Sequence, residues 1–540
     1  MIFWNLSQRG LFGLPAVLVL LWSGCTTLPP SPCSGPRHFL SEAITEKLHP
    51  RKAVALYLHA AEESASLLTA TTSSPETKAA AAMLYNKAVA DCAILLQKIR
   101  FLKNPDRVFQ GLGETYDLHV VDSGKAVLNP SRFDRLIDAQ TIPWKQLGNH
   151  VSRSGIGGTL VGVQNNPWVE VPNRPPRGFA EPVTAVASFG KDAPSTVRQV
   201  EFSLLDPRKE NFITLGKTRF PLAGDFTAPL AYFPKKDGIL YGFLSMLHSD
   251  QSAKHQGIYF CEPYDPAKIP VVFVHGLASA PQAWMEFVNN LNANPKFRRR
   301  YQVWVYRYPS GAPIVVNALR LRTALAEIEA RYHPRHRIIL IGHSMGGILS
   351  RFQVTNSGDT FWNSLFGSKA DAMRAQFSED SILKQTLYFQ ANPHIERVIF
   401  IATPHRGSNL AIMPLASLPS RLIRMPTTLI RQFNSKLKAA IALINPSMTS
   451  IPTSIAGLSP KSPVLKALDK LPINVPYNSI IGNRGQDSVP LAQSSDGVVP
   501  YWSSHMEGAK SELIVPTGHD AFKSPASVAE VLRILNCDEK

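Results

Sequence analysis

The sequence predicts an α/β fold for the C-terminal half of the chain, with a mostly parallel sheet that helices cover on both faces. From about Ile269 onward, short continuous apolar runs alternate with longer stretches that suit helices. Such runs are typical of strands buried on both faces, and parallel strands need crossover connections between them. A glycine-bounded turn at residues 342–347 directly follows one of these runs. Because the chain has 540 residues, we expect two to four domains in all.

Each strand expected in this half is a short apolar run. In chain order they are Val271–Val274, Gln302–Tyr306, Ile338–Ile341, Val398–Ile401, Ser479–Ile481 and Leu513–Val515. A terminal helix is predicted at Pro525–Leu535, because proline is tolerated in the first turn of a helix. Between the fourth and fifth strands, residues 409–476 form an insertion rich in leucine, isoleucine, methionine and proline.

The turn at residues 342–347 has the sequence GHSMGG and is the strongest indication of chemistry. A G-x-S-x-G pattern between a strand and a helix predicts a nucleophile elbow, in which the serine takes a strained backbone conformation. Side chains at positions 342 and 346 would collide in such a tight turn, so both are glycine. The strain presents the hydroxyl group of Ser344 to a base. The competing interpretation is an ordinary glycine-rich turn with an incidental serine.

The chain from Ile269 onward resembles lipases and esterases of the α/β-hydrolase superfamily, through this turn and four further motifs. The further motifs are HGL at 275–277, TPHRGS at 403–408, DGVVP at 496–500 and Gly518-His519. A TPHxGS segment after the next strand also resembles lecithin:cholesterol acyltransferase-like and GPI-deacylase-like lipases. The resemblance covers about half of the chain and implies the α/β-hydrolase fold. It indicates no particular substrate.

The resemblance also implies that an acid and a histidine follow the nucleophile in the chain. Asp496 is the preferred acid, because an acid-glycine-apolar turn suits a carboxylate that accepts from an imidazole; Asp487, in a polar loop, is the alternative. His519 is the expected base, since a pKa near neutrality lets it take the serine proton and return it to the leaving group. His505 is the second candidate and is expected to be a surface or structural histidine.

Two backbone amides are expected to form the oxyanion hole of this site. They are the N–H groups of Leu277, in the turn after the first strand, and of Met345, directly after the nucleophile. A second donor matters because negative charge develops on the carbonyl oxygen only in the transition state. We expect His275 to stabilise the turn and to take no protons during the reaction. In lipases the insertion at 409–476 often holds a lid, so its apolar residues either line an acyl pocket or form a buried cap.

The N-terminus resembles a bacterial lipoprotein signal. Residues 1–24 contain an apolar stretch, Leu11–Trp22, whose length suits the core of a signal peptide better than a membrane span. In such signals the next cysteine, here Cys25, is acylated and becomes the mature N-terminus, and a proline-rich tether at 25–38 follows. Trp22 departs from the pattern, because leucine is usual three positions before the cysteine. An ordinary secretory signal and an uncleaved anchor are therefore the alternatives.

Composition and charge reduce the number of possible compartments and binding partners. The chain is 44% hydrophobic and 18% charged, which suits folded domains with substantial cores. Its formal net charge of +17 is compatible with nucleic acid, an anionic membrane surface or solubility alone. No nucleic-acid-binding motif accompanies the charge, so we favour an anionic lipid surface. Thr26 after the cysteine is not aspartate, so the resemblance implies the outer membrane, facing the periplasm.

Four cysteines remain if Cys25 carries lipid. They are Cys33, Cys92, Cys261 and Cys537. An even number permits two disulfides in an oxidising compartment, but the sequence cannot choose among the pairings, and free thiols are the alternative. No cysteine or histidine spacing indicates a metal site, and the expected chemistry needs no metal or organic cofactor.

Two regions between the tether and the catalytic domain at 266–540 carry no catalytic motif. Residues 39–114 are predicted to be helical, with two similar alanine- and tyrosine-containing stretches. The stretches resemble either a tetratricopeptide-like pair that binds a partner or, as we favour, a helical hairpin packed on the next domain. In residues 115–265, short apolar runs separated by glycine and proline predict a β-rich domain.

The expected function is hydrolysis of carboxylic esters by a serine mechanism, with lipid or long-acyl esters favoured because the signal places the protein at a membrane. An acyltransferase would use the same residues and differ by excluding water. A serine peptidase or amidase on the same fold is a further alternative. A membrane-tethered interaction protein, binding through its helical pair and carrying a vestigial hydrolase domain, is the alternative from another class.

Overall fold

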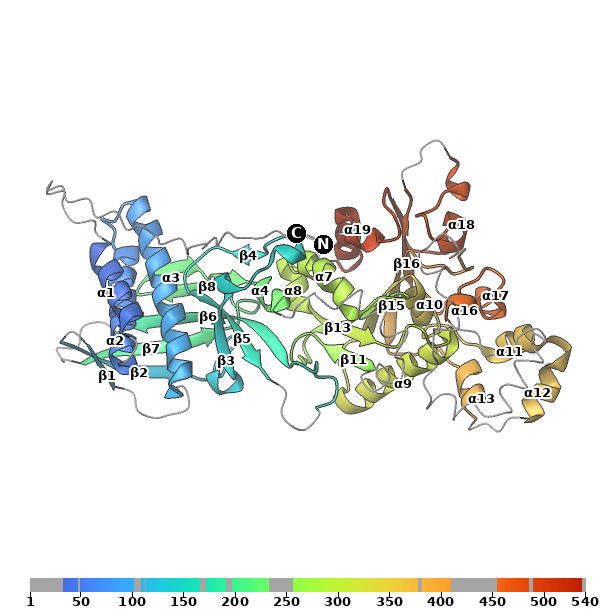
Figure 1. The fold of residues 1–540 in the computed structure, drawn as a ribbon, viewed down its shortest axis with the longest axis horizontal. Coiled ribbons are helices and arrows are strands. Elements are labelled where there is room, and N and C mark those ends of the chain that lie inside the picture. Colours follow the sequence, from blue (N-terminus) through green and yellow to red (C-terminus); the bar gives the residue numbers. More distant parts are fainter. Residues whose placement is uncertain are drawn as a thin grey trace, which may run out of the picture.

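The computed structural model places two units along the long axis of the molecule, with helices α1–α3 at the end remote from the C-terminal unit (Figure 1). It describes residues 33–46, 49–101, 108–111, 113–165, 171–190, 197–232, 256–376, 381–408, 454–484 and 489–536. The signal peptide, Cys25 and the first part of the tether lie outside the described residues, as do Asp487, Cys537 and residues 409–453 of the insertion.

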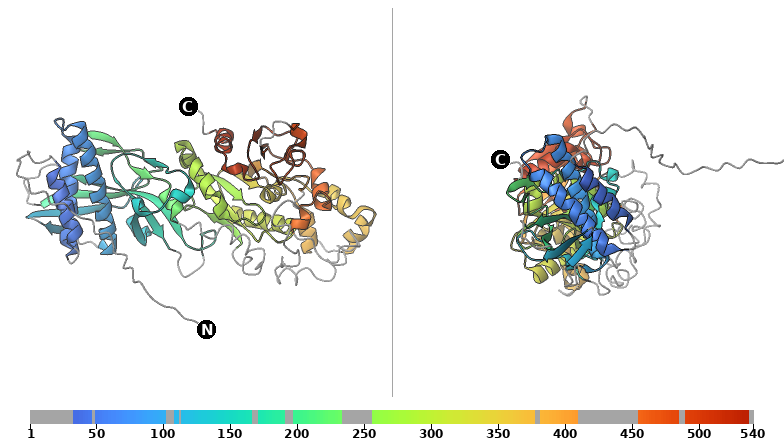
Figure 2. Two further views of the ribbon diagram at one scale, coloured as in Figure 1. Left: turned by 45° about the horizontal axis from the view of Figure 1, so that its top comes forward. Right: turned by 90° about the vertical axis from the view of Figure 1, so that its left-hand side faces the viewer.

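The N-terminal unit packs three helices against a six-stranded mixed sheet (Figure 2). The helices are α1 (Ser34–Thr45), α2 (Pro50–Thr69) and α3 (Pro75–Lys98). In spatial order the strands are β1 (Val108–Gly111), β2 (Glu114–Val121), β7 (Val197–Leu205), β6 (Phe179–Phe189), β5 (Gly158–Gln164) and β3 (Arg135–Asp138). Strands β2 and β7 run parallel, and the other neighbours pair antiparallel. Small elements complete the unit: β4 (Ser152–Arg153), β8 (Phe212–Leu215), β9 (Thr218–Pro221), β10 (Gly224–Asp225) and α4 (Ala228–Ala231).

The helices and the sheet of this unit share one apolar core. Its buried members run from Leu40 in α1 through α2 and α3 to Leu222, beyond β9. The boundary expected at residue 114 therefore does not separate two cores, and the favoured hairpin packing is the arrangement observed. The hydroxyl group of Tyr85 donates to the carbonyl oxygen of Ala187 in β6 at 2.7 Å and accepts from the Ala187 N–H at 2.9 Å. Tyr57 and Tyr85 are both buried, so neither side chain is presented to a partner.

Among the described helices, α3 is long and apolar enough to cross a membrane. Its buried residues recur at helical spacing, from Ala81 through Tyr85, Ala88 and Cys92 to Leu96. That face lies in the core shared with the sheet. Here, α3 is thus the core helix of a folded unit.

The C-terminal unit is built on a seven-stranded sheet. In spatial order its strands are β11 (Gly257–Phe260), β13 (Tyr301–Arg307), β12 (Ile269–Val274), β14 (Ile338–His343), β15 (Ile395–Ile401), β16 (Tyr477–Gly482) and β17 (Glu512–Val515). All neighbours pair parallel except β11, which pairs antiparallel with β13. The six predicted strands are all present. The seventh, β11, lies within the region expected to be the β-rich domain, so the sheet begins before the boundary placed at residue 266.

Both faces of this sheet are buried. In β12, Val272 and Val274 belong to one core, while Val271 and Phe273 belong to another on the opposite face. Helices α9 (Ile314–Tyr332) and α10 (Met345–Arg351) cover the first face. The second is covered by α7 (Met285–Leu291), α8 (Pro295–Arg300) and α19 (Pro525–Ile534). This arrangement confirms the doubly covered parallel sheet predicted from the continuous apolar runs.

The remaining helices described in this unit are short. They are α11 (Gly358–Phe366), α12 (Ala370–Gln376), α13 (Ile382–Leu387), α16 (Ser454–Gly457), α17 (Pro463–Asp469) and α18 (Tyr501–Ser504). Among them, α13 packs beside α9 and α11 packs against α17. Figure 1 shows α11, α12 and α13 at the far end of the molecule from α1.

Partly buried polar contacts join the two units. The guanidinium group of Arg208 pairs with Glu262 at 2.5 Å and with Glu181 at 2.9 Å. The amide of Asn289 in α7 donates to the carbonyl oxygen of Asn149 at 2.8 Å. Since Arg208 and Glu181 come from the first unit and Glu262 precedes β12, these contacts fix one unit against the other.

The described cysteines do not form disulfides with one another. Cys92 and Cys261 are free thiols, and burial raises the pKa of the Cys261 thiol to about 12. The thiol group of Cys33 lies 3.8 Å from the carbonyl oxygen of Thr77 in α3. Of the two possibilities that the sequence left open, disulfides or free thiols, the free thiol describes Cys92 and Cys261.

Candidate active site

The chain makes the predicted sharp turn between β14 and α10. Ser344 has φ 53° and ψ −125°, a conformation that costs energy for any residue with a side chain. A Cβ atom at Gly342 would lie 2.6 Å from the carbonyl oxygen of Gly346, and one at Gly346 would lie 2.5 Å from that of His275. A Cβ atom at Gly347 would come within 2.8 Å of the Cβ atom of Thr403. The glycines are thus required by close backbone approach, and the third one by the TPHRGS segment.

Ser344, His519 and Asp496 form a chain of hydrogen bonds. The Nε2 atom of His519 lies 2.9 Å from the Oγ atom of Ser344, and its Nδ1 atom lies 2.8 Å from the Oδ2 atom of Asp496. A carboxylate only accepts, so Nδ1 carries the proton and Nε2 is free to accept from the serine hydroxyl group. Each residue follows the carboxyl end of a parallel strand, β14, β16 or β17, and these ends lie at one edge of the sheet.

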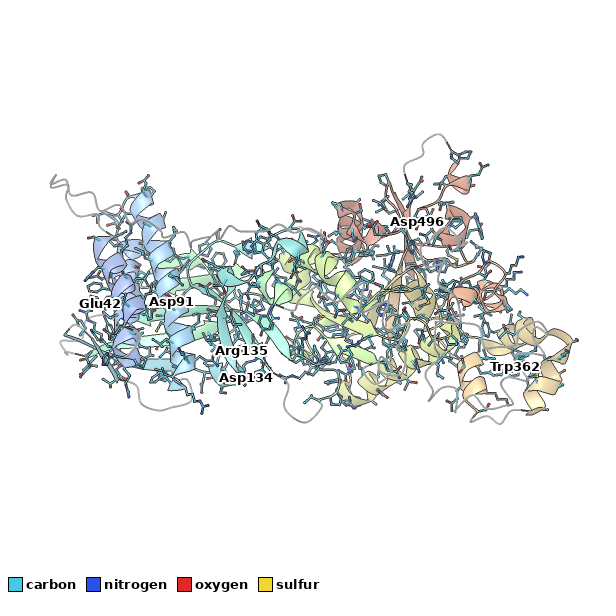
Figure 3. The ribbon with its side chains drawn as sticks, viewed as in Figure 1. Glu42, Asp91, Asp134, Arg135, Trp362 and Asp496 are labelled. Atoms are coloured by element: carbon cyan, nitrogen blue, oxygen red, sulfur yellow. The ribbon has the colours of Figure 1, made fainter. Side chains whose placement is uncertain are left out.

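Asp496 is held in place by the backbone of its own turn. Its Oδ1 atom accepts from the N–H groups of Val498 and Val499, at 2.7 Å each. Its side chain is 1% exposed, so these bonds and the one to His519 compensate for the water that the carboxylate has lost. Gly497 has φ +91°, which lets the turn close around the carboxylate. Figure 3 labels Asp496 beside the strands of the C-terminal unit.

The rival candidates do not enter this arrangement. His505 is engaged elsewhere, because its Nδ1 atom lies 2.7 Å from the Oε2 atom of Glu512 and 3.1 Å from the hydroxyl group of Tyr501. It therefore has the structural role expected of the second candidate. Asp487 lies outside the described residues. The choice of Asp496 as the acid therefore depends only on the position of Asp496 itself.

The two expected oxyanion donors lie next to Ser344. Met345 is the first residue of α10, so its N–H has no acceptor within the helix. Leu277 is partly buried in the turn after β12, which begins beside the nucleophile: a Cβ atom at Gly276 would lie 3.1 Å from the Cβ atom of Ser344. The Met345 amide thus follows Ser344 directly in the chain, and the Leu277 amide follows a glycine that lies close to Ser344.

His275 has the structural surroundings expected for it. Its ring is buried and stacks on Tyr308, with 4.2 Å between the ring centroids. Its Nδ1 atom lies 2.9 Å from the carbonyl oxygen of Gly276. Burial lowers the pKa of His275 to about 4, so the ring is neutral near pH 7 and remains a fixed part of the turn.

Two residues near the site, the partly buried His343 and the buried Arg351, were not singled out by sequence reasoning. The Nε2 atom of His343 lies 2.8 Å from the backbone carbonyl oxygen of His519. The guanidinium group of Arg351, at the end of α10, donates to the carbonyl oxygen of Leu468 at 2.9 Å. Burial lowers the pKa of Arg351 to about 10. Both residues stand in or near the recognised motif, but their partners lie more than a hundred positions away along the chain.

Arg351 ties the nucleophile helix to the end of the insertion. Asp469 in α17 lies 3.8 Å from Arg351 and 3.0 Å from Arg406, which belongs to the TPHRGS segment. Leu465 and Leu468 of α17 are buried in the core that α9 and α10 share. The described end of the insertion is therefore packed on the domain, whereas residues 409–453 of the insertion expected to hold a lid at 409–476 lie outside the described part.

Over the described ranges, no group of three or more histidine, cysteine, aspartate or glutamate side chains is arranged to hold a metal ion. The polar groups at the site instead form one chain from a carboxylate through an imidazole to a hydroxyl group. Such a chain activates a serine for attack on a carbonyl carbon.

The fold and this site define the C-terminal unit as a serine-containing α/β-hydrolase domain. The model of the alpha/beta hydrolase family matches residues 271–531, a range that begins within β12, runs beyond β17 and includes all three residues of the hydrogen-bonded chain. The C-terminal unit thus has the α/β-hydrolase fold and matches the model of that family. No curated protein sequence matches the chain.

Several solved structures resemble about half of the chain at low identity. Lipase BlEst2 of Bacillus licheniformis, in its mature form, is 20% identical with a TM-score of 0.31, over 52% of this chain and 97% of the lipase chain. A carboxyl esterase of metagenomic origin is 16% identical with a TM-score of 0.24, over 47% of this chain and 65% of the other. Phospholipase PlaB of Legionella pneumophila is 16% identical with a TM-score of 0.26, over 44% of this chain and 45% of the other.

Proposed function

We propose that this protein hydrolyses carboxylic esters through an acyl-enzyme on Ser344. The Oγ atom attacks the carbonyl carbon while His519 takes the hydroxyl proton, and the Leu277 and Met345 amides bind the oxyanion. His519 then protonates the leaving alkoxide, which departs as an alcohol. Water, deprotonated by His519, attacks the acyl group and releases the acid, and the proton returns to Ser344. Asp496 orients the imidazole and stabilises its cationic form.

The continuous pair of hydrogen bonds from Asp496 through His519 to Ser344 carries this proposal. Order along the chain alone did not require the three side chains to meet, since 175 positions separate Ser344 from His519. The strained conformation of Ser344 adds support, because strain of this kind is kept where it presents a reacting group.

Labelling with a fluorophosphonate probe tests the nucleophile. We expect the wild-type protein to be labelled and Ser344→Ala to remain unlabelled, with Ser350→Ala as the matched control. Ser350 is a buried serine in the same helix, α10, and its hydroxyl group donates to the carbonyl oxygen of Gly346 at 2.9 Å. Equal labelling of wild type and Ser344→Ala would refute the proposal. Product analysis in the presence of an added alcohol separates hydrolysis from acyl transfer.

The proposed substrates are lipid or long-acyl esters. The support comes from the sequence, in which a lipoprotein-like signal precedes the enzyme and an apolar insertion follows β15. A series of p-nitrophenyl esters of increasing acyl length tests this: we expect kcat/KM to rise from acetate to octanoate or longer. A maximum at acetate with a steady fall thereafter would contradict it, whereas the nucleophile assignment would stand.

We further propose that Cys25 carries the lipid anchor and that the protein faces the periplasm from the outer membrane. Metabolic labelling with an alkyne fatty acid should mark the wild-type chain and leave Cys25→Ser unmarked. Fractionation should move Cys25→Ser from the membrane to the soluble periplasmic fraction. A Cys25→Ser protein that remains acylated would overturn the assignment.

A protein partner of the N-terminal helices is the other proposal from the sequence. Because Tyr57 and Tyr85 are buried in the core that the helices share with the sheet, any such partner must contact the outer surface of the helices. Met83 lies on that surface and is 75% exposed. A binding partner lost on Met83→Asp but retained in Ser344→Ala would support this role; one lost in neither variant would argue against it.

A further inference from the structure

His343 lies between the base and the turn expected to hold the oxyanion. It is the last residue of β14 and stands directly before the nucleophile. Its ring centroid is 4.9 Å from that of His519. On the other side, a Cβ atom at Gly276 would lie only 3.2 Å from the Nδ1 atom of His343. The imidazole thus fills the space between two parts of the site that come from different strands.

The hydrogen bond from His343 has a fixed direction. Its Nε2 atom lies 2.8 Å from the backbone carbonyl oxygen of His519, and a carbonyl oxygen only accepts. The proton of the neutral ring is therefore on Nε2. This bond holds the main chain of His519, while the two bonds described above hold its side chain. The base is then fixed at its backbone as well as at both ring nitrogens.

The surroundings keep His343 uncharged. The groups that face it are His519, Asp496 and Asp520, together with the rings of Trp284 and Phe522. Burial lowers the pKa of His343 to about 3, and the neighbouring His519 contributes in the same direction. A neutral donor is what the site requires, because a second cation beside His519 would oppose its protonation during the reaction.

We propose that His343 is a positioning residue that holds His519 in reach of Ser344 through its Nε2–H bond to the His519 backbone. This inference rests on the proposed ester hydrolysis and adds a residue to the machinery of that site. Without the bond, the segment after β17 that carries His519 loses a fixed contact with the strand that carries the nucleophile. Small displacements of a reacting group cost large factors in rate, about 10²-fold for about 1 Å.

A purely structural role is the competing explanation, since the ring also packs against Trp284 and Phe522. Glutamine and methionine separate the two roles. They have similar length and volume, but only glutamine offers an N–H donor near the position of Nε2. Both replacements remove the imidazole ring, so a packing role predicts equal effects and a positioning role predicts rescue by glutamine.

The experiment uses the full chain as wild type, His343→Gln, His343→Met, Phe522→Leu and Ser344→Ala. It measures the rate of fluorophosphonate labelling, kcat and KM for p-nitrophenyl butyrate, and the unfolding midpoint in urea. We expect His343→Gln to label within about threefold of wild type, and His343→Met to label about 10- to 100-fold more slowly, with kcat falling and KM nearly unchanged. Phe522→Leu, which alters packing against the ring, should lower the urea midpoint and leave labelling within about threefold.

The outcomes separate this inference from the function on which it rests. Equal losses in the glutamine and methionine variants, or no loss in either, would overturn the positioning role. A rise in KM with unchanged kcat in His343→Met would overturn it too, because substrate binding rather than the base would then be affected. Labelling of Ser344→Ala at the wild-type rate would instead remove the proposed function, whatever the His343 variants do.

Discussion

Replacing Asp496 with asparagine tests the orientation of the base. The Oδ1 atom of Asp496 accepts from two backbone amides at 2.7 Å each, and Oδ2 accepts from Nδ1 of His519 at 2.8 Å. In Asp496→Asn only the amide oxygen can satisfy the two N–H donors, so the NH₂ group must face Nδ1. That group donates, which leaves Nδ1 without its proton and places the proton on Nε2, pointing at Ser344. In this tautomer His519 cannot accept the serine proton.

The size of the loss follows from the tautomer. The same exchange in a serine protease triad lowers kcat by about 10⁴, which corresponds to about 5.5 kcal/mol of transition-state stabilisation. We expect a loss of that order for Asp496→Asn, with KM changed by less than about threefold, because the carboxylate does not touch the substrate. The assay is kcat and KM for p-nitrophenyl butyrate, with the rate of fluorophosphonate labelling measured in parallel.

Two matched variants control this measurement. Asp520 directly follows the base in the sequence, and its half-exposed carboxylate pairs with Lys523 at 3.0 Å. In Asp520→Asn, kcat should therefore stay near the wild-type value. Asp487→Asn tests the acid that sequence reasoning kept as an alternative. If Asp496→Asn kept more than about a tenth of the wild-type kcat while Asp487→Asn lost it, the assignment of the acid would be refuted.

Three further perturbations test the structure around the site. Gly346→Ala should lower the free energy of unfolding by about 2–4 kcal/mol and abolish labelling, because its Cβ atom would lie 2.5 Å from the carbonyl oxygen of His275. Gly190→Ala is the control: its Cβ atom would make only ordinary contacts, the nearest at 3.5 Å, so this variant should unfold in urea like wild type. Burial lowers the pKa of His275 to about 4, below its unfolded value near 6.5, so between these pH values the unfolded state binds a proton that the folded state does not. The free energy of unfolding should therefore fall by up to about 3 kcal/mol as the pH drops from about 6.5 to 4. A His275→Asn variant whose stability, measured by urea titration, has the same dependence on pH would contradict this. Tyr85→Phe should cost about 1–3 kcal/mol by leaving two buried groups of Ala187 unpaired, yet leave the labelling rate unchanged; a slower rate at full folding would show that the N-terminal unit acts on the site.

The strands of the catalytic sheet and the nucleophile elbow could be predicted from the sequence, because the patterns that indicate them are local. Val271–Val274 and Ile338–Ile341 are continuous apolar runs, and such runs identify strands buried on both faces without knowledge of their neighbours. The glycines at 342 and 346 follow from the tightness of one turn. The order of the candidate residues along the chain was also readable, once the motifs had indicated the superfamily.

Pairing between distant segments was not readable in this way. Strand β11, with only four residues, gives the same apolar pattern in either unit, and only its antiparallel pairing with β13 assigns it to the catalytic sheet. The helices at 34–98 and the strands that follow were predicted as two separate regions, because each has its own hydrophobic periodicity. They form one unit, because the apolar face of α3 has no other surface on which it can be buried.

The sequence by itself determined which strand would end in a strained serine and which residue types could activate it, because turn sterics and proton chemistry depend on neighbours in the chain. The tertiary structure alone decided that His519 lies 2.9 Å from Ser344, that Asp496 faces its ring, and that His343 bonds to its backbone. Those contacts arise where the carboxyl ends of parallel strands meet at one sheet edge, and strand order is fixed by burial on two faces, which no short segment encodes.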